Sequence, residues 1–217
     1  MDGSGEFFTE FAAALAPEVE STVVSYPQSE LGYPDLAAHA RKALPDRPHI
    51  LVAESFSGPI AIALAASAPP GLRGVVLVCS FARSPLPGFL QFLSGGPPVW
   101  RVPEWIAMWM LLGKASTPLH RKLLAAKMHS VPPAVWRARM RAVISADVTS
   151  RLREVRVPIL YLRALWDRVV PAAAGDWVLR NANDASVVDL EGPHFLLQAR
   201  PRETAEHVKG FARRVGA

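Results

Sequence analysis

The chain has 217 residues, half of them hydrophobic, which is enough for one compact domain with a buried core. Its single cysteine, Cys79, excludes an internal disulfide framework, and the apolar residues around it predict a buried thiol in a reducing compartment. The net charge is +5, and neither the first eight residues nor the short apolar stretch 105–113 has the form of a signal peptide or a membrane span, so we expect a cytoplasmic protein.

Short apolar, β-branched runs alternate with longer helical patterns along most of the chain. This alternation is typical of a parallel sheet flanked by helices, so we predict an α/β fold. In chain order, the expected elements are helix 5–15, strand 21–26, helix 34–44, strand 49–53, helix 59–68, strand 74–79, strand 158–163, helix 172–181, strand 186–190 and helix 202–214.

The alternation stops between residues 83 and 153, where the chain becomes rich in proline, glycine and tryptophan, with helical patches but no convincing strand. We interpret this segment as a helical cap inserted into a core formed by residues 1–82 and 154–217, folded over the carboxyl ends of the strands, where α/β proteins bind their ligands. The large apolar side chains of the cap either line an acyl pocket or form the cap's own core: Trp100, Trp105, Met108, Trp109, Met110 and Trp136.

The sequence AESFSGP lies between a predicted strand and a predicted helix, and it contains two candidate nucleophiles, Ser55 and Ser57. A nucleophile elbow needs small residues two positions before and after the reactive residue, because the turn is sharp. Ser55 has Ala53 and Ser57 at these positions, whereas Ser57 would have Pro59, which is not small. We therefore predict that Ser55 is the nucleophile, unless the sequence is merely a turn of small residues.

A carboxylate and an imidazole follow at the ends of later strands. Asp167 lies in the loop after strand 158–163, and His194 lies in a glycine-proline turn after strand 186–190. Because the carboxyl ends of parallel strands meet at one edge of a sheet, we expect both side chains near Ser55. The alternatives are less well placed, since they fall in helices, inside a strand, at the opposite edge or in the cap: His39, His49, His120, His129, His207, Asp147 and Asp189.

The order serine, aspartate, histidine, with a helical insertion before the aspartate, resembles the α/β-hydrolase superfamily over nearly the whole chain. The acid-bearing segment ALWDRVV is similar to that family's Gly-x-x-Asp-x-x-Val, with Ala164 in place of the glycine. The resemblance implies that Ser55 is the nucleophile, His194 the general base and then acid, and Asp167 the group that orients the imidazole. It also implies that the Phe56 backbone N–H stabilises the oxyanion.

The superfamily places the second oxyanion donor after a strand and a His-Gly or Pro-Gly dipeptide. The segment MDGSGEFF resembles the loop that follows, but neither the strand nor the dipeptide comes before it in this sequence. Met1 would occupy the donor position. In the sheet of the superfamily, the strand before this loop lies between the strands that correspond to residues 21–26 and 49–53. Without it, we expect these two strands to have unpaired edges. We further expect either a natural chain that starts upstream of Met1 or a weakened oxyanion hole.

We therefore expect a serine hydrolase of the carboxylesterase or thioesterase type, acting on a small to medium apolar acyl ester without a metal or organic cofactor. An acyltransferase with the same three residues, or a non-catalytic binding or scaffold protein on this fold, are the alternatives. Glu54 is either a polar residue held by backbone amides at the strand end or a group that tunes His194.

Residues 120–156 carry nine lysines and arginines against two acids. Such a basic segment can attract an acidic partner, for example a carrier protein of the acyl group. The alternative is a solvated helical face, and no aromatic residues are interleaved with the charges in the way that nucleic-acid binding requires. We expect no nucleic-acid partner, and the oligomeric state is left open.

Overall fold

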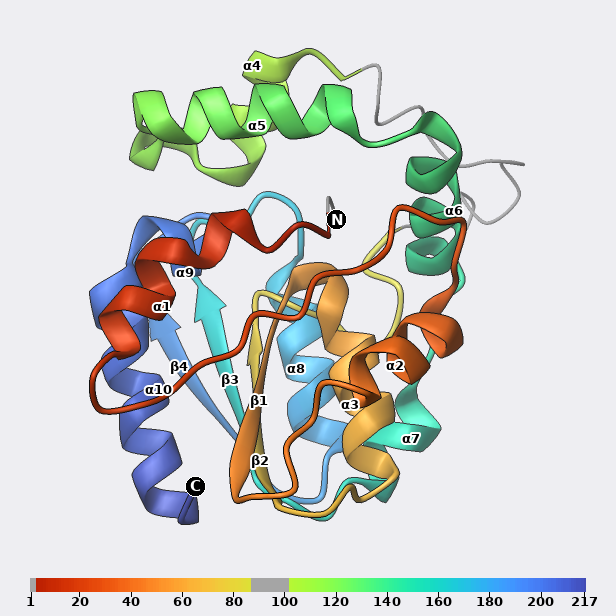
Figure 1. Cartoon of the computed structure of the whole chain (residues 1–217), viewed down its shortest axis with the longest axis vertical. Helices are drawn as coiled ribbons and strands as arrows, with labels where there is room; N and C mark the ends of the chain where they lie inside the picture. The colour runs from red at the N-terminus through yellow and green to blue at the C-terminus, as the bar shows by residue number, and fades with distance from the viewer. Residues whose placement is uncertain (1–2, 87–101) are drawn as a thin grey trace.

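The computed structural model describes residues 3–86 and 102–217. In this part of the chain, four parallel strands form one sheet in the order β1 (His49–Glu54), β2 (Leu72–Val78), β3 (Ile159–Ala164) and β4 (Ala185–Leu190) (Figure 1). The register pairs Val76 of β2 with Val52 of β1 and with Leu160 of β3. The predicted α/β fold with a parallel sheet is confirmed.

Helices cover both faces of the sheet because alternate residues of each buried strand point to opposite sides. Val76 and Leu160 face one layer, formed by α1 (Thr9–Leu15), α9 (Leu196–Ala199) and α10 (Pro201–Val215). Val75 and Ile159 face the other layer. This second layer contains α3 (Gly58–Ala66), α7 (Thr149–Glu154) and α8 (Ala172–Asn181), with α2 (Tyr33–Arg41) packed on α3.

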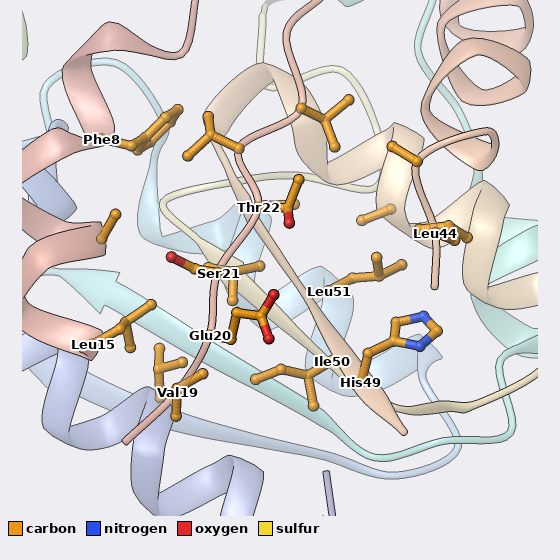
Figure 2. Close-up of a pocket in the computed structure, with 18 of the residues that line it drawn as sticks. Phe8, Leu15, Val19, Glu20, Ser21, Thr22, Leu44, His49, Ile50 and Leu51 are labelled. Carbon is orange, nitrogen blue, oxygen red and sulfur yellow. The ribbon is translucent and has the colours of Figure 1, made fainter. Parts of the chain in front are cut away.

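The predicted strand at residues 21–26 is wrong. The segment is extended, but it forms no ladder with any described strand, and β1 pairs only with β2 in the described part of the chain. A cavity of about 430 Å³ separates the segment from β1, and Figure 2 shows Ser21 on one side of it and Ile50 and Leu51 on the other. Paired strands lie about 4.8 Å apart, so the two segments are too far apart to pair. This cavity lies where the resemblance implied a further strand.

The helices that follow β2 lie above the carboxyl ends of the strands in Figure 1. They are α4 (Glu104–Leu111), α5 (Pro118–Ser130) and α6 (Pro133–Ile144), with the short 3₁₀ turn η5 (Gly113–Ala115) between α4 and α5. Two further 3₁₀ turns, η1 (Glu6–Phe8) and η2 (Ser55–Ser57), lie earlier in the chain. The two ends of the segment are held together, since Val148 N donates to Ala82 O at 2.8 Å. The boundaries of the cap at 83 and 153 remain a prediction. At the second boundary, α7 packs against α3 and α8, which cover the sheet.

No helix within residues 3–86 and 102–217 has both the length and the apolar character needed to cross a bilayer.

Candidate active site

The turn after β1 holds Ser55 in a conformation that few residues adopt. Ser55 has a φ of 52°, in the left-handed region that side chains other than glycine rarely occupy. Gly58 follows at the start of α3, and a Cβ at that position would lie 1.8 Å from the Ser80 Oγ atom. The turn therefore needs a glycine, because Ser80, which follows β2, lies too close to leave room for a side chain at position 58.

Ser80 fixes the backbone of this turn. Its hydroxyl donates to the Ser55 carbonyl oxygen at 2.6 Å. Ser80 is held in turn by Tyr161, whose hydroxyl donates to the Ser80 carbonyl oxygen at 2.6 Å and accepts from the Ser80 N–H at 3.1 Å. Sequence reasoning missed both residues, because the partners are far apart in the chain and a serine after a strand is an ordinary loop residue.

The three side chains predicted to act together lie in one chain of hydrogen bonds. His194 Nδ1 lies 2.8 Å from Asp167 Oδ2, and His194 Nε2 lies 2.8 Å from Ser55 Oγ. An ionised carboxylate can only accept, so the imidazole proton belongs on Nδ1 and Nε2 is free to accept from the Ser55 hydroxyl. The His194 and Asp167 side chains are only 1% and 6% exposed, so water does not compete for these bonds.

Backbone amides orient the Asp167 carboxylate. Its second oxygen, Oδ1, accepts from the N–H of Val169 at 2.7 Å and from the N–H of Val170 at 2.8 Å. These two bonds hold the carboxylate in one orientation. Asp167 is therefore arranged to hold the imidazole through one oxygen while the loop holds the other.

Above these groups lies a cavity of about 300 Å³ that reaches both Ser55 and His194. Its other walls are almost entirely apolar. They come from the N-terminal segment, the helices above the sheet and the loops beside the site: Phe7, Phe8, Val24, Val102, Ala107, Met110, Leu111, Leu124, Met128, Trp136, Met140, Val169 and Phe195. Lys127 also lines the cavity, and its ammonium group is paired with the carboxylate of Glu6.

Of the large apolar cap residues considered from the sequence, Met110 and Trp136 line the cavity, whereas Trp105, Met108 and Trp109 do not. Trp105 and Trp109 are 72% and 56% exposed, and Met108 is buried against Leu112 and Leu124 rather than in the cavity wall. α4 instead turns Ala107, Met110 and Leu111 toward the cavity. The sequence WIAMWMLL is apolar on every side, so it contains no pattern from which the inward face of the helix could be predicted.

Of the two predicted oxyanion donors, Phe56 belongs to the described residues and Met1 does not. Phe56 follows Ser55 in η2, and its side chain is buried against the ring of Tyr33, with ring centroids 5.0 Å apart. Met1 lies outside the described residues, as does Trp100. Close by, the Tyr26 hydroxyl donates to Ser57 Oγ at 3.3 Å, which gives the second serine of the turn a structural partner.

A model of the alpha/beta hydrolase family matches residues 3–207. The chain belongs to this family. No curated protein is similar enough in sequence to match it.

Solved structures of low sequence identity share the alpha/beta hydrolase fold. A hydrolase from Oleispira antarctica superposes with a TM-score of 0.79 at 12% identity, covering 97% of this chain and 88% of that one. The enol-lactonase from Burkholderia xenovorans gives 0.77 at 16% identity, with 98% and 88% covered. The esterase RhEst1 from Rhodococcus sp. gives 0.76 at 18%, with 99% and 88% covered. At these identities, the likeness concerns the fold alone.

Much of the basic segment of this alpha/beta hydrolase is engaged within the chain itself. Arg139 is 1% exposed and donates to the Pro27 carbonyl oxygen at 2.9 Å. Other cations of residues 120–156 contact carboxylates or an amide of the same chain: Lys127 with Glu6, Arg141 with Glu30, Arg151 with Glu154, and Arg153 with Asn181. These contacts give the positive charges an internal structural role.

Proposed function

We propose that the protein is a cytoplasmic serine hydrolase that cleaves a carboxylic ester or thioester of a small to medium apolar acyl group. The observation that carries the proposal is the chain of hydrogen bonds from Ser55 through His194 to Asp167. Ser55 and His194 also line an apolar cavity that can hold an acyl group. A cytoplasmic location agrees with the one cysteine, Cys79, which is free and buried.

In the proposed reaction, Ser55 Oγ attacks the carbonyl carbon while His194 Nε2 takes the hydroxyl proton. The tetrahedral intermediate collapses as the imidazolium returns that proton to the departing alcohol or thiol, which leaves Ser55 acylated. A water molecule then attacks the acyl-enzyme, again losing its proton to Nε2. The second collapse releases the carboxylic acid and restores the Ser55 hydroxyl. Asp167 stabilises the imidazolium in both halves of the reaction.

The negative charge on the carbonyl oxygen needs donors that are already in place. The backbone N–H of Phe56 is the donor that the proposal assigns, at the N-terminal side of α3, where the helix dipole also favours negative charge. One such donor is commonly worth about 10² to 10³ in rate. The Phe56 amide directly follows Ser55, whose backbone has a positive φ.

The cavity favours an uncharged acyl group. Its wall offers dispersion contacts along most of its surface, and the one ammonium group in it, on Lys127, already has Glu6 as a partner. A volume of about 300 Å³ lies at the lower end of ordinary small-molecule sites. We therefore propose short and medium aliphatic acyl chains as substrates.

A series of p-nitrophenyl esters and matched thioesters, from acetyl to palmitoyl, tests the proposal. We expect kcat/KM to rise from the acetyl ester to a medium chain and then to fall, and we expect Ser55→Ala to remove the activity. Transfer of the acyl group to an added alcohol in preference to water would identify an acyltransferase instead. Absence of turnover across the series, with a folded protein, would contradict the proposal and favour the non-catalytic alternative.

A further inference from the structure

A buried carboxylate connects the Ser55 turn to the segment that follows His194. Glu54 ends β1, is 8% exposed and directly precedes Ser55. Its Oε1 atom accepts from the Leu197 N–H at 3.2 Å, and its Oε2 atom accepts from Gln198 Nε2 at 2.9 Å. Both donors belong to α9, the short helix that begins just after His194.

His194 is coupled to the same helix through the backbone, because the Leu196 N–H donates to the His194 carbonyl oxygen at 2.9 Å. Glu54 therefore fixes the distance between the turn that carries Ser55 and the turn that carries His194. The contact of 2.8 Å between Ser55 Oγ and His194 Nε2 depends on that distance. A displacement of about 1 Å between reacting groups can cost roughly 100-fold in rate.

We propose that Glu54 is a positioning residue for His194, and that its negative charge also stabilises the imidazolium formed during the reaction. The inference rests on the proposed function, because it assigns His194 as the base. It goes further because it adds a second carboxylate to Asp167. Glu54 would act on the position of His194 through its hydrogen bonds to α9, and on the charge of His194 by electrostatic attraction.

The charge of Glu54 needs an explanation of its own. Burial raises the pKa of this carboxyl group, so the folded protein holds the ionised form at a cost, while the two donors and the positive charge of a protonated His194 act in the opposite direction. A glutamine at position 54 could accept from the Leu197 N–H just as well. The carboxylate instead accepts from both donors at once, and it brings a negative charge beside the turn that carries His194.

The other groups around His194 are accounted for in the described residues. Asp167 approaches from the loop after β3 and Ser55 from the turn after β1, while the Phe195 ring lies 6.0 Å from the imidazole between centroids. Cys79 lies beside Asp167, and burial raises the pKa of its thiol well above the usual range. Tyr161, whose pKa burial also raises, interacts with Cys79 and Asp167, and Lys127 lines the same cavity as His194, paired with Glu6.

Gln198 provides a way to remove only the charge. Its Oε1 atom is buried without a hydrogen-bond partner in the described residues, while its Nε2 atom donates to Glu54. If residue 54 is changed to glutamine, rotation of the Gln198 amide by half a turn lets Oε1 accept from the new amide group. The Leu197 N–H keeps its acceptor. Glu54→Gln thus preserves the connection to α9 and loses the charge.

The test compares the wild type with Glu54→Gln, Glu54→Leu and the exposed control Glu10→Gln. The measurements are kcat/KM for a p-nitrophenyl ester against pH, the NMR titration midpoint of the His194 ring, and the thermal unfolding midpoint. In Glu54→Gln we expect the acid limb of the rate profile and the ring midpoint to move together to lower pH by roughly one unit, because the imidazolium loses a nearby negative charge. We expect the control to follow the wild type.

Glu54→Leu removes the connection as well as the charge, and we expect kcat to fall by about 10- to 100-fold with little change in KM. If this variant does not fold, Gln198→Leu replaces it, since it removes one of the two hydrogen bonds between Glu54 and α9 and keeps the charge. A folded Gln198→Leu with the kcat of the wild type would then overturn the positioning part. The double variant Glu54→Gln/Gln198→Glu tests the charge, since it returns a carboxylate to the pair. We expect that double variant to move the acid limb of the rate profile part of the way back toward its position in the wild type.

An unchanged ring midpoint in Glu54→Gln would overturn the electrostatic part of the inference, and a folded Glu54→Leu with the kcat of the wild type would overturn the positioning part. These outcomes differ from failure of the proposed function, in which the wild type itself has no esterase activity. The NMR titration decides the inference even in that case, because it requires no turnover.

Discussion

The two sides of the active-site cavity are built differently. Below it, the residues we call the polar floor are tied by short, directional hydrogen bonds to backbone atoms and to one another: Glu54, Ser55, Ser80, Asp167 and His194. Above it, the residues we call the apolar wall make mainly dispersion contacts: Phe7, Ala107, Met110, Leu111, Leu124, Met128 and Trp136. The directional bonds of the floor place individual atoms, whereas the wall determines chiefly a volume.

This difference predicts where a single substitution abolishes the reaction and where it only changes the preferred substrate. A change in the floor should reduce turnover for every substrate by similar factors. A change in the wall should reduce turnover for some chain lengths and spare others. The substitutions that follow test this division.

The largest effect is expected for Asp167→Asn. The amide can still accept from the Val169 and Val170 N–H groups through its oxygen, but its NH₂ group then faces His194 Nδ1 and favours the wrong tautomer. We expect kcat to fall by about 10³- to 10⁴-fold for short and long esters alike. Steady-state kinetics across the ester series measures this, and a loss confined to long chains would contradict the division.

Gly58→Ala tests the close approach that shapes the floor. The new Cβ would lie 1.8 Å from Ser80 Oγ and 2.9 Å from Ser80 Cβ, so one of the two segments must move. We expect a loss of about 1–3 kcal/mol in the free energy of unfolding, measured by urea denaturation.

The double variant with Ser80→Ala removes the closer contact and should recover part of that loss. Simple addition of the two single effects would indicate that the glycine is needed for a reason other than this contact.

Met128→Trp changes the wall alone. Met128 lines the cavity from α5, and a larger side chain there reduces the volume open to an acyl chain. We expect kcat/KM to fall by about tenfold for medium-chain esters and by less than about threefold for the acetyl ester. Trp105→Ala is the matched control on the outer face of the helices, since Trp105 is 72% exposed, and it should leave the chain-length profile unchanged. An equal loss for all chain lengths in Met128→Trp would mean that the wall also positions the reacting groups.

The smallest effect concerns the pH dependence of stability and tests the cost of burying the Glu54 carboxylate in the polar floor. Because the pKa of Glu54 in the folded protein is raised above its usual value of 4.5, protonation favours the folded state. Stability contributed by this group is present below about pH 4.5 and is lost as the pH rises through the folded-state pKa.

Relative to Glu54→Gln, the wild type should therefore lose stability as the pH rises above about 4.5. Urea unfolding of both proteins across that range measures the difference. A wild type that gains stability over Glu54→Gln as the pH rises would mean that hydrogen bonds outweigh the cost of burial.

The floor was largely predictable from the sequence, whereas the wall was predictable only in part, at Met110 and Trp136. Ser55, Asp167 and His194 each follow a strand, and the topology of a parallel sheet brings the ends of such strands together whatever the details of packing. Strand alternation and the small residues around Ser55 were enough to predict their proximity. The supporting contacts of Ser80 and Tyr161 depend on long-range packing, for which the local sequence contains no signal. Glu54 was a candidate because it directly precedes Ser55, but its partners Leu197 and Gln198 were not predictable.

Two predictions failed for physical reasons that the structure makes plain. Residues 21–26 have the apolar, β-branched composition of a strand, but a strand also needs a partner at pairing distance, and a cavity separates this segment from β1. Trp105 and Trp109 lie in a helix that is apolar all round, so its orientation is determined by the surroundings rather than by an amphipathic pattern. In both cases the tertiary environment decided what local composition could not.

The central claim is that Ser55 is a nucleophile activated by His194. The most direct measurement is covalent labelling by a fluorophosphonate probe, with the modified residue located by peptide mass spectrometry, in the wild type, Ser55→Ala, Ser57→Ala and His194→Ala. We predict a single adduct on Ser55 that persists in Ser57→Ala, disappears in Ser55→Ala and forms at least about 100-fold more slowly in His194→Ala. An adduct on Ser57, or a rate of labelling that does not change in His194→Ala, would contradict the account.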